Sequence, residues 1–420
     1  MNHALQNLLW PAHLVPAEHR PNIRHIYLEN IWFAVLNSST ASFLGVYLAR
    51  LGATPAQVGL FIAMPAVLNL LLTLPAGAWA QRFPVMKITP RVTALTRAFC
   101  LLFVPLAWIF KEQQQIWAII LIVLVMNISG TVMAVLTNAF IGEVIHCECR
   151  AQVIGVRNAL LAAVSIVASL GVGQILTRIP FPAGYQVMFA IGVVGAVMSS
   201  YHQLMMRPVA GAGPAPALPG CDDPALQALA VIARPSLRIE LLKGRYARFL
   251  AVIAFYYFAI FYLAPLFPLY QVNVLRFSDQ TISIGASLYW VVQLVVSFQA
   301  GKLARRIHFR GLTGWGMVSS ATAMLVFMFS YSLPVYAFCQ LFSGSGWAMM
   351  NVGLVNYLLE QMPDNDRPAH LTWYNLVLNA ATLAGSLVAP LVAGWTGLFW
   401  AMAFAVAFRF FSGMLILKKG

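Results

Sequence analysis

Charged residues are scarce in this sequence. Asp, Glu, Lys and Arg make up 9% of its 420 residues, whereas 60% are hydrophobic. Soluble globular domains contain about 25% charged residues, so an ordinary soluble fold is excluded. Apolar stretches of membrane length, about 18 residues or more, recur along the whole chain instead. The sequence therefore predicts an all-α integral membrane protein.

Acidic residues are the scarcest charged group, and none falls in the middle of a predicted span. The 12 Asp and Glu residues lie at span ends or in loops. A mechanism that protonates a carboxylate at the bilayer centre therefore has no residue to use. Glu29, five residues past Arg24, either lies at the level of the lipid headgroups or is a protonatable coupling site.

The sequence also shows no sign of a disulfide, a zinc site or a cleavable leader. No two of the five cysteines fall in one predicted outer loop, so we expect no structural disulfide. His146, Cys147, Glu148 and Cys149 place soft ligands together, but no second pair with zinc-site spacing appears. We expect neither a metal nor a cofactor. The first apolar run has full membrane length, which argues against a cleavable signal peptide.

The apolar segments form two sets of six spans. Between the sets, residues 207–245 contain Gly211-Ala212-Gly213-Pro214-Ala215-Pro216, which no helix traverses. The rest of this segment is typical of a short amphipathic helix on the membrane surface. The predicted units are a six-helix bundle over 1–206, a linker over 207–245 and a second bundle over 246–420. The spans are 26–49, 55–81, 88–110, 115–142, 151–177 and 185–206, then 246–273, 280–304, 311–331, 334–360, 369–394 and 396–416.

Basic residues are distributed unevenly between alternate segments. With the N-terminus inside, inner segments hold 22 Lys and Arg, with Arg409 counted among them. Outer segments hold four, which are Arg50, Lys111, Arg178 and Arg276. Cytoplasmic loops carry the excess of Lys and Arg, so both termini and the linker are predicted to be cytoplasmic. Clustering in alternate loops also argues against nucleic-acid binding.

Several features occur twice. Gly77 and Arg82 stand where one span ends and the next begins, and Gly301 and Arg306 repeat this arrangement 224 residues later. Thr54 begins the second span with Pro55 and Gln57 behind it, which is a capping-box pattern, and Ser278 stands 224 residues on. Glu143, Arg150 and Asn158 recur as Glu360, Arg367 and Asn375 at an offset of 217. Halves with an even number of spans run parallel, related by an axis along the membrane normal.

With its six plus six spans, central linker and repeated Gly-plus-basic turn, the chain resembles the Major Facilitator Superfamily over essentially its whole length. The family motif, Gly-x-x-x-Asp-Arg-x-Gly-Arg-Lys/Arg, is matched by Gly77 and Arg82, but Gln81 replaces its acid and Pro84 its second glycine. The second copy keeps Gly301 and Arg306, with Arg305 at the acidic position. The resemblance implies two bundles that rock about a central site.

The loop residues admit two interpretations. Gly77, Arg82, Gly301, Arg305 and Arg306 either form a cytoplasmic gate, the glycines letting helices touch, or only fix the topology. The repeated acids and bases either pair structurally and in gating or contact the solute. The expected pairs are Glu143 with Arg150 or Arg157, and Glu360 with Arg367.

The resemblance implies that helices 1, 4, 7 and 10 line the cavity. Polar groups in mid-span are candidate solute contacts, and the alternative is hydrogen bonding or packing between helices. Arg97 and Arg157 either extend back to the interface or pair with another helix, or else one of them faces the central cavity and attracts an anionic group. The candidate cavity residues are Asn37, Thr40, Asn127, Thr131, Tyr257, Gln293, Asn351 and Asn379.

We therefore expect a carrier for a small organic solute, working by alternating access as a monomer in the bacterial inner membrane. A neutral or amphipathic solute fits the uncharged polar groups best, and an organic anion held by Arg97 or Arg157 is second. The sequence leaves open whether transport is coupled to a proton. The alternative is a non-transporting sensor or assembly factor on the same scaffold. An enzyme is not expected, because Asp222-Asp223 and Asp364-x-Asp366 lack the further acids of a two-metal site.

Overall fold

The computed structural model describes residues 20–80, 82–145, 147–208, 239–363 and 367–419, and these contain helices and turns but no strand. The first bundle comprises α2 (Arg20–Leu36), η2 (Asn37–Ala41), α3 (Ser42–Arg50), α4 (Pro55–Ala80), α5 (Val85–Ala98), η3 (Phe99–Phe103), α6 (Leu106–Ile109), α7 (Glu112–Val144), α8 (Cys147–Arg178) and α9 (Ala183–Leu204). The second comprises η4 (Ile239–Leu242), α11 (Arg245–Leu263), α12 (Leu266–Leu269), η5 (Tyr270–Val274), α13 (Asp279–Met328), α14 (Leu333–Glu360) and α15 (Arg367–Lys419).

Two of these helices are hairpins rather than single rods. α13 has 50 residues and α15 has 53, which would make each about 75 Å or longer, whereas the hydrocarbon core is about 30 Å thick. The backbone reverses at His308 (φ 58°) in α13 and at Gly397 (φ 83°) in α15. Within the described residues this gives six spans in each bundle, as predicted.

In the part of the chain that the structure describes, eight helical stretches are long and apolar enough to cross a membrane, and these include both hairpins. The two spans outside this set are α14 and the broken α5–η3–α6. α5 carries Lys87, Arg91 and Arg97, which lower its hydropathy.

The predicted helix starts are confirmed in detail. The Gln57 amide N–H donates to Thr54 Oγ1 at 3.3 Å, and the Thr54 N–H donates to Gln57 Oε1 at 2.9 Å. In the second bundle the Thr281 N–H donates to Ser278 Oγ at 3.2 Å. Each cap satisfies amide groups that a helix terminus leaves without an internal partner.

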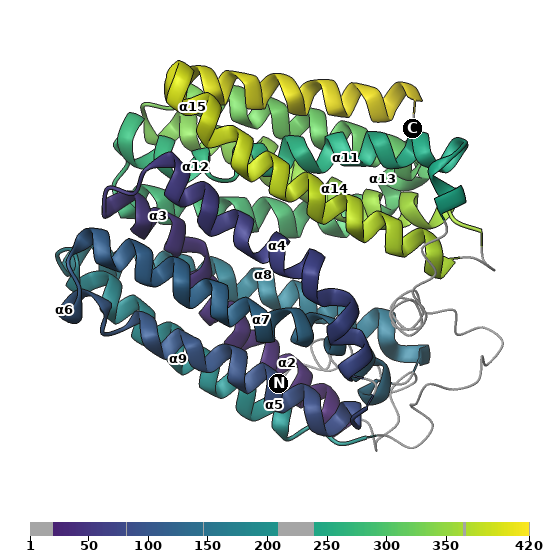
Figure 1. Cartoon of the computed structure of the whole chain (residues 1–420). Coiled ribbons are helices and arrows are strands. Elements are labelled where there is room, and N and C mark those ends of the chain that lie inside the picture. The colour runs from purple at the N-terminus through teal and green to yellow at the C-terminus, as the bar shows by residue number, and fades with distance from the viewer. Residues whose placement is uncertain (1–19, 81, 146, 209–238, 364–366, 420) are drawn as a thin grey trace.

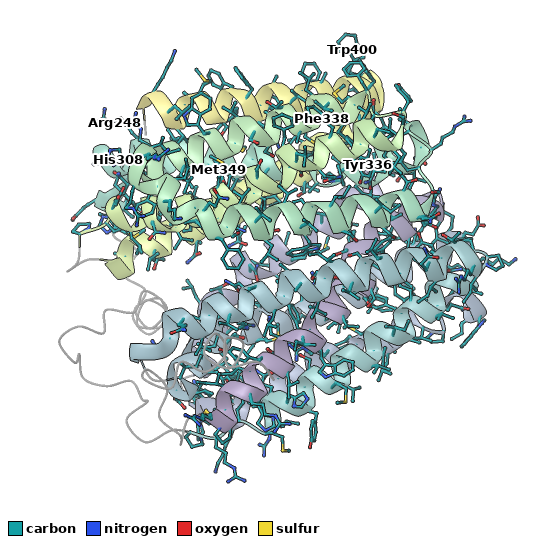
Figure 2. All side chains as sticks on the ribbon, turned by 180° about the vertical axis from the view of Figure 1, so that it is seen from behind. Arg248, His308, Tyr336, Phe338, Met349 and Trp400 are labelled. Carbon is teal, nitrogen blue, oxygen red and sulfur yellow. The ribbon has the colours of Figure 1, made fainter. Side chains whose placement is uncertain are left out.

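The bundles lie side by side, and their ribbons diverge toward one end (Figure 1). We call this the Arg82 end; the turn after α4, the turn at His308 and the end of α15 lie there. The opposite Arg50 end holds the end of α3 and the start of α13. Figure 2 shows Arg248 and His308 at the Arg82 end and Trp400 at the other.

Glycines allow the bundles to touch near the Arg50 end. A Cβ added to Gly59 of α4 would lie 2.4 Å from Pro390 Cγ and 2.7 Å from the Ser386 carbonyl oxygen of α15. A Cβ on Gly173 of α8 would lie 2.6 Å from Ser283 Cβ of α13. Any larger side chain at Gly59 would force the backbones apart, so close packing between bundles depends on it.

The boundary between the bundles lies between Leu204, where α9 ends, and Arg245, where α11 begins. The predicted surface helix of the linker falls largely within 209–238, outside the described residues.

Candidate functional site

A cavity of about 400 Å³ lies between the two bundles. Volumes of about 300–1,000 Å³ are typical of small-molecule sites. Its walls are apolar and aromatic with a few amides and hydroxyls, and none of the described residues that line it is charged. The lining residues include Ser42, Gly45 and Phe61 from the first bundle and Gln271, Tyr289, Trp290, Tyr336, Gln340 and Ser343 from the second.

Two π-helical turns border this cavity. η2 interrupts the first span of the first bundle and contributes Ala41, and η5 interrupts the first span of the second and contributes Gln271. The Gln271 amide donates to the Tyr336 hydroxyl at 2.9 Å. Such π turns are rare and occur frequently at functional sites. The lining of this cavity is uncharged and aromatic, which is the kind of lining that the sequence predicted.

None of the eight predicted cavity residues lines this cavity. In the first bundle, Thr40 faces α9, where a Cβ on Gly192 would come within 2.0 Å of its Oγ1. Thr131 donates to Asn69 Oδ1 at 2.9 Å, and Asn127 donates to the Val123 carbonyl of its own helix at 2.7 Å. Asn37 is half-buried in η2.

The four candidates of the second bundle are also outside its lining. The Tyr257 and Tyr374 hydroxyls lie 2.6 Å apart, and Asn379 donates to the Asn375 carbonyl at 2.8 Å. Asn351 is exposed. Gln293 lies one helical turn from Tyr289, and its buried Oε1 has no hydrogen-bond partner among the described residues. The Thr131 and Tyr257 contacts match the alternative reading, hydrogen bonding between helices.

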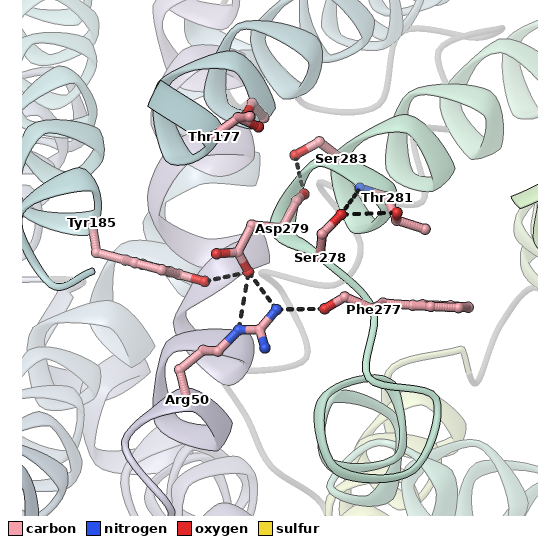
Figure 3. Close-up of polar contacts among 9 residues, drawn as sticks. Arg50, Thr177, Tyr185, Phe277, Ser278, Asp279, Thr281 and Ser283 are labelled. Carbon is pink, nitrogen blue, oxygen red and sulfur yellow. Dashed lines mark hydrogen bonds and ion pairs between the residues drawn. The ribbon is translucent and has the colours of Figure 1, made fainter. Parts of the chain in front are cut away.

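A polar cluster joins the bundles at the Arg50 end (Figure 3). Arg50 Nε and Nη2 donate to Asp279 Oδ1 at 3.2 and 3.0 Å, and Nη2 also donates to the Phe277 carbonyl at 2.5 Å. The Tyr185 hydroxyl donates to the same carboxylate oxygen at 2.9 Å. Sequence reasoning missed this cluster. A signal was available: Arg50 ends the first span, Asp279 precedes the span that begins at 280, and both positions were predicted to lie on the outer side of the membrane.

A second polar cluster lies inside the first bundle. Arg97 Nη2 donates to Glu29 Oε1 at 2.8 Å, and Arg157 Nη2 lies 3.7 Å from Glu29 Oε2. The Ser199 hydroxyl lies 3.0 Å from Glu29 Oε1, and Asn30 donates to the Arg157 carbonyl at 2.6 Å. Glu29 is 7% exposed. Its carboxylate therefore faces the interior of the first bundle.

This cluster corrects the predicted pairing of the repeated acids and bases. Arg157 pairs with Glu29, not with Glu143, because it faces α2 across the bundle. Arg150 donates instead to the Gly142 and Ile145 carbonyls at 3.1 Å, which satisfies the end of α7. Glu360 is exposed, and the Arg367 side chain lies outside the described residues.

The Arg82 end carries the predicted gating residues as exposed groups. Arg82, Arg305 and Arg306 are exposed and Gly77 is buried. The prediction that Gly301 lies where two helices touch is wrong in this conformation, because Gly301 is exposed and a Cβ there would meet no atom within 4 Å. The metal-ligand run His146–Cys149 falls outside the described residues or side chains.

The prediction that Arg409 belongs to an inner loop is wrong, because this residue lies within a membrane-spanning helix. It lies midway along the second arm of α15, 8% exposed, facing the interior of its bundle. Its Nε and Nη2 donate to the Ala259 and Ile260 carbonyls at 3.4 and 3.3 Å, and its Nη1 donates to Ser320.

The sequence matches the family model of the Major Facilitator Superfamily over residues 30–278 and 249–419. No curated protein matches it. A structure of nucleoside transporter NupG superposes with a TM-score of 0.70 at 13% identity, covering 94% of this chain and 99% of that one. A bacterial homologue of iron transporter ferroportin gives 0.67 in its inward-facing state, at 16% identity with 95% and 99% covered. In its outward-facing state it gives 0.59, at 14% identity with 94% and 98% covered.

Proposed function

Because the chain belongs to the Major Facilitator Superfamily, we propose that it moves a small organic solute across the membrane by alternating access. One observation carries this proposal: the bundles meet near Arg50 and diverge toward Arg82 around a cavity with uncharged polar and aromatic walls. A carrier that opens to one side at a time requires this asymmetry.

The Arg82 end is proposed to be cytoplasmic, and the conformation is then inward-facing. The excess of Lys and Arg in segments at this end supports the assignment. The better superposition on the inward-facing than on the outward-facing state of the ferroportin homologue, 0.67 against 0.59, supports it too. Both termini are then cytoplasmic, in a multi-pass protein of the bacterial inner membrane that acts as a monomer.

In this scheme the Arg50–Asp279 cluster is the outer gate. It closes the Arg50 end in the inward-facing state and must separate when that end opens. The basic residues Arg82, Arg305 and Arg306 are proposed to take part in the inner gate of the opposite state, in which the two bundles approach each other at the Arg82 end. Glu143, Arg150, Glu360 and Arg367 are proposed to act there as well.

Distances between spin labels at the two ends test alternating access. Labels at Arg178→Cys and Asn273→Cys report the Arg50 end, and labels at Phe83→Cys and Lys302→Cys report the Arg82 end. Both pairs are built in a background without the five native cysteines. A solute found by thermal-shift screening of metabolites and drugs should lengthen one distance while it shortens the other. If both distances change together, or neither changes, alternating access is wrong.

The alternative function, a sensor or assembly factor, is separated by flux. Purified protein in liposomes should exchange labelled solute for unlabelled solute trapped inside. A sensor binds the solute and moves none. Locking the outer gate with a disulfide across the Arg50 end should stop flux and leave binding from the Arg82 end intact.

A further inference from the structure

A smaller cavity of about 140 Å³ lies inside the first bundle, separate from the cavity between the bundles. Side chains from α2, α5, α7, α8 and α9 surround it. Its polar lining consists of Glu29, Thr93, Arg97, Thr137, Arg157 and Gln203, and the remaining walls are apolar. The volume is below the range of about 300 Å³ and above that holds a whole drug-sized molecule, so it suits one group of a ligand or a small ion.

The charges in this cavity do not balance. Two guanidinium groups, Arg97 and Arg157, face a single carboxylate, Glu29. Both oxygens of that carboxylate are already engaged, one by Arg97 and Ser199 and the other by Arg157. Among the described side chains, one positive charge therefore remains inside a membrane-spanning bundle, shared between Arg97 and the partly exposed Arg157. An uncompensated charge at this depth is costly and is a default sign of a functional site.

Hydrogen-bond donors are also left over. Arg97 Nη1 and Arg157 Nε are buried without a partner among the described residues, and so is the Thr93 hydroxyl. The Arg97 side chain is only 10% exposed. Arginine presents its donors in a planar fork that matches the two oxygens of a carboxylate or of a phosphate. Unused donors and an unbalanced positive charge thus occur on the same two side chains.

We propose that this cavity binds the anionic group of the transported solute, a carboxylate or a phosphate-type group, against Arg97 and Arg157. Glu29 does not bind the solute; it holds Arg97 in place and offsets one of the two cations. The inference rests on the proposed function and names its substrate class. It also reverses the preference for a neutral solute drawn from the sequence. A phospholipid headgroup offers the same chemistry, and the experiment separates the two sources.

The test measures the unfolding temperature of purified protein in nanodiscs of zwitterionic phosphatidylcholine. The probes are acetate, benzoate and inorganic phosphate, with benzamide as the uncharged match for benzoate. At least one anion should raise the unfolding temperature saturably, and benzamide should not. If no anion does so, the proposal is overturned. If the rise appears only with phosphatidylglycerol in the disc and not with soluble anions, the occupant is a lipid and the solute assignment is wrong.

Variants decide whether the effect comes from this cavity. Arg157→Gln should abolish the anion-dependent rise, and its unfolding temperature without anion should equal or exceed that of the wild type, because the excess charge is gone. A purely structural Arg157 would lower it instead. The double variant Glu29→Gln with Arg97→Gln keeps the local charge difference and tests Arg97 without leaving Glu29 unpaired. It should bind at least tenfold more weakly.

Arg91→Gln is the matched control, because Arg91 lies on the same helix six residues before Arg97 and is exposed. It should keep the full response. An equal loss in Arg91→Gln would show that the anion acts on surface charge and would overturn the proposal. Failure here stays distinct from failure of the proposed function: flux without anion binding refutes only the substrate class, whereas anion binding without flux refutes transport.

Discussion

The two bundles differ in how they accommodate arginine side chains in their interiors. In the first, Arg97 and Arg157 meet the carboxylate of Glu29. In the second, the partners of Arg409 among the described residues are all neutral, namely the Ala259 and Ile260 carbonyls and the Ser320 hydroxyl. Charge is partly cancelled in one bundle, and in the other it is solvated by dipoles alone.

This difference separates the features that the two halves share from those that they do not. Features that shape the backbone recur in both halves, among them the caps at Thr54 and Ser278 and the π turns in the first span of each bundle. The buried charges do not recur. We infer that the helical scaffold is common to both halves, whereas the polar chemistry inside each half is separate, so that only one half is built to hold an anion.

The largest expected effect comes from removing the carboxylate of the first bundle. Glu29→Ala leaves two guanidinium groups without a counter-charge, that of Arg97, whose side chain is 10% exposed, and that of Arg157, whose side chain is 25% exposed. Breaking a fully buried pair in this way costs about 3–5 kcal/mol, and the solvent at Arg157 places the expected loss toward the lower end. The free energy of unfolding in mixed micelles measures it. Glu112→Ala is the control, since Glu112 is exposed in the first turn of α7 and should cost less than about 1 kcal/mol. Similar losses in both variants would contradict a special role for the first bundle.

A smaller loss is expected from the second bundle. Arg409→Met removes hydrogen bonds from a charged donor, worth about 1.5–3 kcal/mol, but it leaves no charge behind because every partner is neutral. Arg248→Met, at an exposed position, should have little effect. The same unfolding measurement applies. If Arg409→Met cost more than Glu29→Ala, the contrast drawn between the bundles would be wrong.

The hydroxyl pair of the second bundle should contribute less again. Tyr257→Phe removes the 2.6 Å hydrogen bond to Tyr374 without changing the ring. Hydrogen bonds between membrane helices average about 0.6 kcal/mol, so the expected loss is of that order. Tyr331→Phe, at an exposed residue, serves as the control. A loss as large as that of Arg409→Met would show that hydroxyls, not the guanidinium, organise this interior.

The smallest effect on stability, with a visible effect on conformation, is expected where the bundles meet. Arg50→Gln breaks a pair whose side chains are 26% and 18% exposed, and such pairs contribute about 0–1 kcal/mol. Even that much changes the ratio of two conformers up to about fivefold. The spin-label pair at Arg178 and Asn273 should therefore report a larger open fraction at the Arg50 end. An unchanged distribution would remove the cluster from the gate.

The sequence predicts most of this fold because the signals are local. Span lengths follow from hydropathy, and the starts at Thr54 and Ser278 follow from capping residues within three positions. The candidate site could not be predicted in this way, because its contacts join residues far apart in the sequence. Glu29 meets Arg97 and Arg157 across 68 and 128 residues, and the rotation of each helix about its axis decides which side chains meet.

The predicted cavity residues illustrate the same limit. Apolar residues surround these helices on nearly every side, so no polar stripe marks the face turned toward the other bundle. Asn127 and Asn379 donate to carbonyls of their own helices, which sequence position alone does not reveal. The residues that do line the cavity, such as Gln271 and Tyr289, came from spans whose type was predicted and whose orientation was not.

The turns at His308 and Gly397 restrict how the second bundle can deform. In each hairpin a single residue with non-helical φ and ψ joins the two arms, so there is little chain to allow one arm of α13 or of α15 to slide past the other. We therefore expect each hairpin to move as one body. The helical hydrogen-bond ladder is interrupted at η2, η3 and η5 and at the internal prolines Pro65, Pro75, Pro90 and Pro390, and we expect bending at such places. Of the three irregular turns, η2 and η5 border the cavity between the bundles.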